Sequence, residues 1–322
     1  MGGLIQRKIR RFGFFQLKNQ TEDLQFTIEN SRKNHPDGNR RLHQPPRQPR
    51  CMDTTVWHID DLDHPFVHAL MERGIPAGHR FTMAKADVET ASRRFRHALE
   101  AFPDGIVPPW LDPQVNVTLQ TRANPPSNPQ GTHIKLRLLG PHEPDQTSTG
   151  NTGTVTIAIH HLLSGHPSTP YSDILRAWRD ETEQREQPPE LKILGGHWVT
   201  LHDAARAVLR IGNKVSVGEG TIHICGRRWW SAKDTWQELS MLSSRNAAGL
   251  YGTFTTGHLA SGVTVPVTVT EVTQRERQTP ARPDLGPLHR LLIESTGEGW
   301  RPATPLRQGL MQALAEMAEH DD

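Results

Sequence analysis

The densest group of side chains that could bind a metal lies in one short segment. The segment HIDDLDHPFVH brings together three histidines and three aspartates: His58, Asp60, Asp61, Asp63, His64 and His68. If Pro65 begins a helix, His64 and His68 are four residues apart and both could face one ion. A carboxylate from Asp60 or Asp63 would complete a His/carboxylate site suited to a divalent metal such as zinc or manganese.

The same residues also fit a structural role. Acids between a strand end and a helix start cap free amides and interact favourably with the helix dipole. The chain has 18 histidines, so clusters of this residue also arise by chance. A metal-dependent hydrolase or oxygenase centred on His64 and His68 is therefore one hypothesis, and a structural turn is the other.

A second histidine cluster, His160, His161 and His166, follows an apolar β-branched run. Neighbouring side chains on a strand point to opposite faces, so at most one of His160 and His161 could join His166 in a site. Surface or loop positions are the alternative for these side chains.

A third feature has the order helix, turn and hairpin: Thr200–Arg210, then Lys214–Cys225 around Gly218–Gly220, then Gly226–Trp230. This order predicts a winged-helix-like segment whose basic side chains contact phosphates and whose tryptophans stack on bases. The predicted nucleic-acid contacts are Arg206, Arg210, Lys214, Arg227, Arg228, Trp229 and Trp230. The alternative is a small α/β domain in which the tryptophan pair fills the core.

Two short stretches of this region also resemble Mu-type transposases. The segment GTIHICGRRWWS (Gly220–Ser231) looks like a strand of the small β-barrel near the C-terminus of those enzymes, and His161–Pro170 is similar to a segment ahead of it. The resemblance implies a role in mobile-element DNA transactions. The catalytic Asp-Asp-Glu set of the family is not recovered in this chain, so the resemblance identifies no family member.

Several catalytic motifs are missing from the sequence. It contains no GxxxxGK[ST] loop, no GxGxxG, no HExxH, no GxSxG and no CxxC pair. These motifs hold phosphates, metals or an activated serine in common enzyme classes. Their absence makes the common nucleotide-dependent enzymes and serine hydrolases less expected.

Charge is divided unevenly along the chain. Residues 1–51 hold 11 Lys and Arg against 4 Asp and Glu, whereas the whole chain has 37 against 35. A basic segment with few residues to bury is expected to be disordered and to contact an anionic partner such as nucleic acid. A transit peptide in residues 1–18 and a true start at Met52 are the alternatives.

The remaining composition indicates a protein of the cell interior. No run of the chain approaches 18 consecutive apolar residues, so no membrane span is expected. Two cysteines, Cys51 and Cys225, form no disulfide framework, which favours a reducing compartment such as the cytoplasm. Neither feature names a reaction.

Periodicity and turn residues predict an α+β fold with two small mixed α/β units and a C-terminal helix. Helices are expected at Pro65–Arg73, Asp87–Phe102, Ser168–Trp178, Thr200–Leu209, Ser231–Leu242 and Thr304–Met317. Strands are expected at Val56–Ile59, Val115–Thr121, His133–Leu139, Thr154–Ile159, Lys214–Val217, Thr221–Cys225 and Val263–Thr270. The predicted organisation is a tail (1–51), a unit (53–140), a linker (141–153), a unit (154–273), a linker (274–287) and a helical end (288–322).

The leading functional hypothesis is a nucleic-acid-associated, non-catalytic protein. A metal-dependent hydrolase or oxygenase and an interaction module without ligand chemistry are the alternatives. A divalent metal is the cofactor that the sequence indicates, through His64 and His68.

Overall fold

The computed structural model describes residues 55–111, 115, 117–121, 132–141, 154–184, 193–212, 214–215, 220–258 and 281–321. Contacts divide the chain into two units, 1–51 with 248–254, and 52–247 with 255–322. The fold below is that of the second unit. The predicted basic tail, residues 142–153 of the first predicted linker, residues 274–280 of the second and the strand Val263–Thr270 lie outside the described residues.

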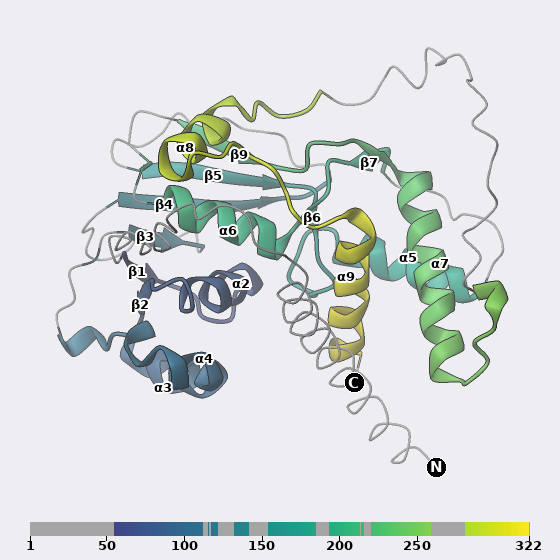
Figure 1. The fold of residues 1–322 in the computed structure, drawn as a ribbon, viewed down its shortest axis with the longest axis horizontal. Coiled ribbons are helices and arrows are strands. Elements are labelled where there is room, and N and C mark those ends of the chain that lie inside the picture. The colour runs from purple at the N-terminus through teal and green to yellow at the C-terminus, as the bar shows by residue number, and fades with distance from the viewer. Residues whose placement is uncertain are drawn as a thin grey trace, which may run out of the picture. The chain divides into compact units, whose positions relative to one another are not determined.

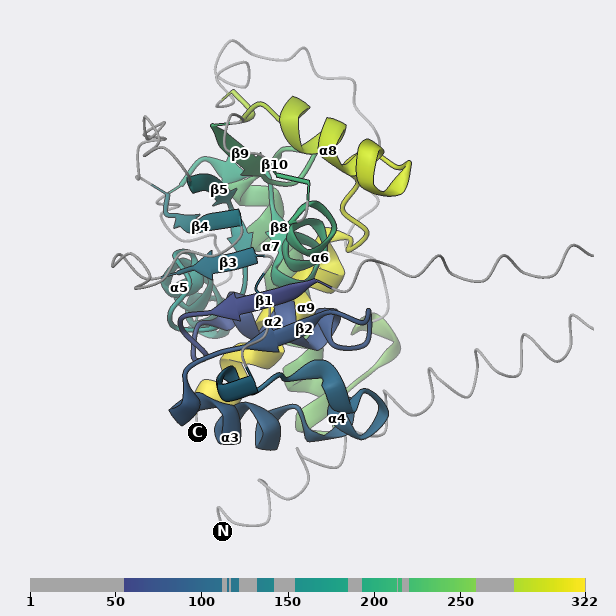
Figure 2. The ribbon, with the colours of Figure 1, turned by 90° about the vertical axis from the view of Figure 1, so that its left-hand side faces the viewer.

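The centre of this unit is one six-stranded parallel sheet (Figure 2). Its strands are β1 (Val56–Ile59), β2 (Arg80–Thr82), β3 (Val117–Gln120), β4 (Thr132–Leu139), β5 (Thr154–His160) and β9 (Thr221–Ile224). They lie in the order β2-β1-β3-β4-β5-β9, and every neighbouring pair is parallel. The prediction of two small mixed units is therefore wrong, because both predicted units contribute strands to the same sheet.

The alternation of apolar residues explains which face of the sheet is packed. Ile134 and Leu136 of β4 are buried, and in register they pair with Val155 and Ile157 of β5. Helices α2 (Pro65–Gly74), α6 (Leu201–Ile211) and α8 (Gly286–Thr296) lie on one side of the sheet (Figure 2). Their apolar side chains form one core with the strands. Truncating a fully buried member of this core, such as Leu70→Ala, should cost about 2–5 kcal/mol of stability.

Local signals set the starts of both main helices. Pro65 occupies the first turn of α2, where its missing amide hydrogen is least costly, and His64 is the N-cap. Thr200 caps α6, because its hydroxyl accepts a hydrogen bond from Asp203 N at 3.2 Å. The helix predicted from Thr200 therefore begins at an N-cap, as its first residue favours.

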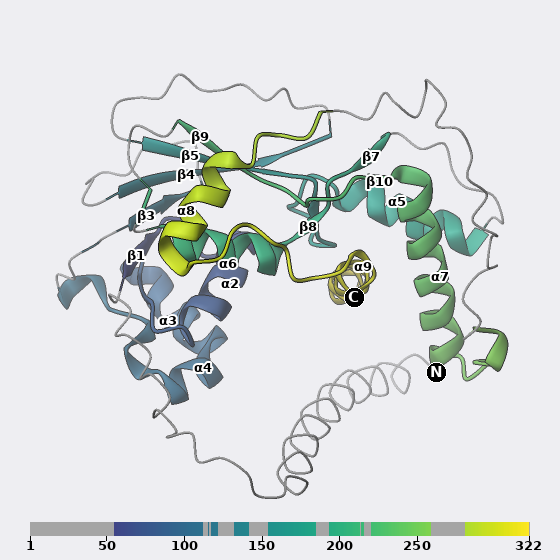
Figure 3. The same cartoon turned by 45° about the horizontal axis from the view of Figure 1, so that its top comes forward.

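Beyond the carboxyl ends of the strands lies a second, smaller core (Figures 1 and 3). It is built by α5 (Ser172–Gln184), α7 (Ala232–Leu250) and α9 (Leu306–His320). Two short two-stranded ladders connect it to the sheet: β6 (Leu162–Leu163) with β8 (Val199–Thr200), and β7 (Gly195–Gly196) with β10 (Trp230–Ser231). Among the described residues, no helix is long and apolar enough to cross a membrane.

The helix predicted over Asp87–Phe102 is present but divided. It consists of α3 (Lys85–Arg94) and α4 (Arg96–Ala101), and Phe95 between them leaves the helical geometry at ψ 20°. Short 3₁₀ turns follow at Pro103–Gly105 and Pro109–Leu111, and another lies at Thr256–His258. Asp87, the first residue of the predicted helix, lies in the first turn of α3, where its carboxylate interacts favourably with the helix dipole.

Candidate functional site

The order of the strands identifies the first place to look for a ligand. In open parallel sheets, ligands bind outside the carboxyl ends of the strands, at the point where the strand order reverses. Here β1 lies between β2 and β3, so that point lies beyond the end of β1. Asp60 follows β1 directly, and its carboxylate accepts hydrogen bonds from Thr121 N at 3.1 Å and Thr121 Oγ1 at 2.8 Å. It therefore joins the ends of β1 and β3.

The turn from β1 into α2 contains the predicted metal site. His64 Nδ1 accepts a hydrogen bond from Phe66 N at 3.3 Å, so this nitrogen is already engaged as a cap. His68 Nε2 contacts the Arg94 guanidinium, which also pairs with Asp63 Oδ1 at 3.4 Å. Burial lowers the pKa of both histidines, and the positive charge of Arg94 lowers the pKa of His68 further.

The metal hypothesis is not supported by this arrangement. A shared ion requires converging ligand atoms at about 2.0–2.2 Å, whereas a cation occupies the side of His68 where the ion would lie. In the described part of the chain, no group of three or more His, Cys, Asp and Glu side chains could hold a metal. We therefore correct the prediction of a metal-dependent hydrolase or oxygenase.

The three histidines of the second cluster have different neighbours, because β5 ends at His160. His160 Nε2 lies 2.9 Å from His223 Nδ1, on β9. His161 has a left-handed backbone with φ 50°, and its ring packs against Tyr171 and Trp198. Burial, together with the neighbouring rings of His160 and His197, lowers the pKa of His161 to about 4. His166 instead packs against His320 of α9, with ring centroids 4.6 Å apart.

The predicted winged-helix-like segment is not a winged helix. Its second predicted strand is β9, which pairs in parallel with β5 as the sixth strand of the central sheet. This strand is therefore part of the central sheet and does not belong to a separate winged-helix domain. The predicted wing tip lies mostly outside the described residues. The transposase-like barrel strand is wrong for the same reason, and we withdraw the nucleic-acid-associated function with its interaction-module alternative.

The residues predicted to bind nucleic acid lie on α6, on the segment that follows it, and between β9 and α7. The Arg228 guanidinium lies over the Trp230 ring at 4.0 Å, and Trp229 packs against His197. Arg227 is exposed, and its carbonyl accepts a hydrogen bond from Arg282. Lys214 follows α6 and is exposed. The structure brings only Arg206 and Arg210 of that set into a shared pocket.

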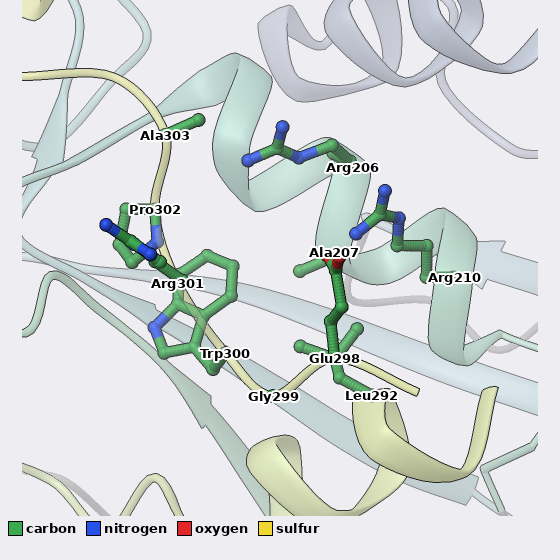
Figure 4. A pocket seen from close by; sticks show the side chains of 10 residues that line it. All are labelled: Arg206, Ala207, Arg210, Leu292, Glu298, Gly299, Trp300, Arg301, Pro302 and Ala303. Carbon is green, nitrogen blue, oxygen red and sulfur yellow. The ribbon is translucent and has the colours of Figure 1, made fainter. Parts of the chain in front are cut away.

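This pocket has a volume of about 430 Å³ and lies between α6 and the segment that follows α8 (Figure 4). Arg206 and Arg210 project from one face of α6, one turn apart, toward the segment that carries Arg301. Glu298 is the acidic residue that lines the pocket. We call the set Arg206, Arg210 and Arg301 the arginine pocket.

Hydrogen bonds hold the two walls of the arginine pocket together. Asp203 is only 3% exposed and accepts hydrogen bonds from Thr304 N at 2.9 Å and Ala303 N at 3.2 Å. The same carboxylate pairs with Arg206 Nη2 at 2.8 Å. One buried acid thus fixes the opposite wall and orients one of the arginines.

The floor of the pocket includes the buried side chain of Trp300. Its indole Nε1 donates to Cys225 O at 2.8 Å, and its backbone N donates to His289 Nδ1 at 3.0 Å. Gly299 allows this approach, because a Cβ atom there would lie 1.8 Å from the His289 ring. The floor is therefore tied to β9 and α8.

Sequence reasoning missed half of this site. Arg206 and Arg210 are among the predicted phosphate contacts because they are basic, but Arg301 and Trp300 lie about ninety positions later in a segment without a motif. No local pattern connects the two segments. Only the packing of α8 against α6 brings them together.

Comparison with known proteins gives structural similarity and no family. No family model and no curated protein matches the chain. The terminal R domain from the myxalamid PKS-NRPS biosynthetic pathway is 11% identical, with 84% of this chain and 92% of that chain covered and a TM-score of 0.47. The Bordetella bronchiseptica enzyme WbmH in complex with NAD+ is 12% identical, with 84% and 100% covered and a TM-score of 0.45. UDP-glucuronic acid 4-epimerase from Bacillus cereus in complex with NAD is 11% identical, with 83% and 100% covered and a TM-score of 0.47.

An open parallel sheet of this kind raises the question of a dinucleotide cofactor at the ends of its strands. In this class of sheet, the turn after the first strand supplies glycines and free helix amides to the pyrophosphate. The corresponding turn here, residues 60–65, reads Asp-Asp-Leu-Asp-His-Pro. The residues present do not fit that group, and the strand order identifies the fold as an open parallel α/β sheet with the order β2-β1-β3-β4-β5-β9.

Proposed function

We propose that this chain is a ligand-binding protein that holds a small oxyanion, a phosphate- or carboxylate-bearing molecule, in the arginine pocket. The observation that carries the proposal is that Arg206, Arg210 and Arg301 line one cavity of about 430 Å³. Its volume falls in the range of about 300–1,000 Å³ that is typical of small-molecule sites. The planar fork of a guanidinium matches carboxylate and phosphate oxygens.

The balance of charge in the pocket favours an anion. Arg206 is partly neutralised by Asp203, at 2.8 Å. Within the described ranges, Arg210 and Arg301 form no ion pair with an acidic side chain. With Glu298 as the acidic lining residue, the pocket keeps an excess of positive charge. An oxyanion between the arginines would offset that excess and form charge-assisted hydrogen bonds.

The pocket is also built to keep its shape. Asp203 bonds one wall, Trp300 bonds the floor, and α6 holds Arg206 and Arg210 at a fixed spacing. A site supported by a helix and by buried hydrogen bonds loses little entropy when a ligand binds. This favours specific recognition over loose counter-ion attraction.

Titration calorimetry with a panel of anions tests the proposal. The panel contains inorganic phosphate, citrate and a nucleoside monophosphate, each titrated into the full chain at constant ionic strength. We expect at least one member to bind, and Arg210→Ala or Arg301→Ala to weaken it at least tenfold, since a hydrogen bond to a charged group is worth about 1.5–3 kcal/mol. Arg73→Ala, on the exposed side of α2, is the matched control and should leave the affinity unchanged.

Two results would contradict the proposed function. One is that no panel member binds at millimolar concentration. The other is that the arginine pocket variants bind as tightly as the wild type. Arg210→Lys separates charge from geometry, because lysine keeps the charge but lacks the fork, and we expect it to restore only part of the affinity.

A further inference from the structure

We infer that the turn between β1 and α2 excludes the pyrophosphate of a nicotinamide dinucleotide. The inference concerns a different place from the arginine pocket. It rests on the hydrogen bonds, the charges and the side chains of residues 60–68.

The first argument is the supply of backbone donors. A helix N-terminus binds phosphate through the free amides of its first turn. In α2, Pro65 has no amide hydrogen, Phe66 N donates to His64 Nδ1 at 3.3 Å, and Val67 N donates to His64 O at 2.9 Å. Asp63 N, just before the helix, donates to Asp61 Oδ1 at 3.2 Å. At Asp63, Phe66 and Val67 the backbone amide already has a hydrogen-bond acceptor, and Pro65 has no amide hydrogen, so none of these positions can donate to a phosphate.

The second argument is charge. Three carboxylates, those of Asp60, Asp61 and Asp63, lie within four residues of the end of β1. Asp60 is held in place by its two hydrogen bonds with Thr121, so it cannot swing away without breaking the link between β1 and β3. A pyrophosphate at this turn would face negative charge at close range, in a partly buried place where screening is weak.

The nearby cation does not reverse this balance. The Arg94 guanidinium contacts Asp63 Oδ1 at 3.4 Å and Leu62 O at 3.4 Å, and it also touches His68. Its donors are directed at the turn itself. Arg94 therefore stabilises the acidic turn rather than offering a free positive group to a ligand.

The third argument is space. Dinucleotide-binding turns use glycines so that the pyrophosphate can approach the backbone. Each of residues 60–65 here carries a side chain, and Leu62 is buried in the core with 4% exposure. The turn is thus packed as a structural element, with Asp60 joining two strands and His64 capping the helix.

Fluorescence titration with NADH and NADPH tests the inference on the full chain. We expect no saturable binding up to about 1 mM, which corresponds to a very weak interaction. The same titrations on a triple variant, Arg206→Ala with Arg210→Ala and Arg301→Ala, identify any dinucleotide that enters the arginine pocket instead. Binding that disappears in the triple variant supports the inference, because the phosphates then use the pocket and not the turn.

Binding of either dinucleotide below about 100 µM that survives in the triple variant would overturn the inference. Circular dichroism on both proteins shows that the comparison is made between folded chains. The proposed function is tested with phosphate, citrate and a nucleoside monophosphate, so its failure is distinguishable from the failure of this inference.

Discussion

The pH dependence of stability should reveal His161 more clearly than any other side chain described. Its pKa is lowered to about 4 because the ring is buried and lies near His160 and His197. In the unfolded chain the same group has a pKa of about 6.5. Between these two values the unfolded state binds the proton and the folded state does not, so protonation favours unfolding.

The sign and the size follow from that difference. The contribution of His161 is fully present above pH 6.5 and is lost as the pH falls toward 4. Between pH 7 and pH 4.5 the free energy of unfolding should decrease by about 2.5 kcal/mol through this group alone. That loss is a large share of the stability of a typical domain, which is about 5–15 kcal/mol.

The variant His161→Asn isolates this effect. Position 161 has φ 50°, and asparagine is among the residues that tolerate the left-handed region best. The substitution removes the packing of the ring, which should lower the free energy of unfolding by a similar amount at pH 7 and at pH 4.5. It also removes the group that takes up a proton on unfolding, so the stability of the variant should depend less on pH. His97→Asn is the control, since the His97 side chain is 94% exposed.

Urea denaturation at pH 7 and pH 4.5 measures the difference. We expect wild type and His97→Asn to lose about 2.5 kcal/mol more than His161→Asn on acidification. Equal losses in all three proteins would refute the reasoning, because the ring would then be protonated in the folded state as easily as in the unfolded one.

Three further predictions concern the walls and floor of the pocket. Asp203→Ala should lower the free energy of unfolding, measured by urea denaturation, by about 2–4 kcal/mol. The substitution removes a carboxylate that is 3% exposed and accepts two backbone hydrogen bonds, and it leaves Arg206 unpaired. A decrease below about 1 kcal/mol would contradict this account. Cys225 should react with a thiol reagent only after unfolding, because burial raises its pKa to about 12, and rapid labelling of the native chain would be inconsistent with that burial. Gly299→Ala should lower the melting temperature by several degrees, since its Cβ would meet the His289 ring, and an unchanged melting temperature would show that the ring moves freely.

Local features could be predicted from the sequence because their causes are local. The start of α2 at Pro65 and the start of α6 after Thr200 follow from residues within one helical turn. Five of the predicted strands are present for the same reason, as with Thr154–Ile159 in β5, a run of mostly β-branched residues that is buried from Val155 onward.

The partners of those strands could not be predicted. The run Thr221–Cys225 reads as a strand in any context, but its pairing with β5 joins segments more than sixty residues apart. Glycines before the run favour a hairpin with the preceding segment, and that local preference led to the wrong prediction of a winged-helix-like segment. Tertiary packing decided between the two arrangements, because Ile222 and Ile224 are completely buried in the central core.

The arginine pocket could not be predicted for the same reason, because its two walls come from segments far apart in the sequence. The helix spacing of Arg206 and Arg210 places both on one surface, and the sequence then allows any anionic partner. A small-molecule pocket differs from a nucleic-acid surface in having a second wall opposite the arginines of α6. Here Asp203 hydrogen-bonds that wall, and Trp300 forms the floor of the pocket. That wall comes from a segment with no motif.

The most direct test of the arginine pocket is anomalous diffraction from crystals of the full chain soaked with selenate, a tetrahedral oxyanion. The account predicts an ordered selenium peak in the pocket, with its oxygens within hydrogen-bonding distance, about 2.7–3.2 Å, of the Arg210 and Arg301 guanidinium groups. A pocket without a peak, or a peak at the β1–α2 turn beside Asp60, would contradict it.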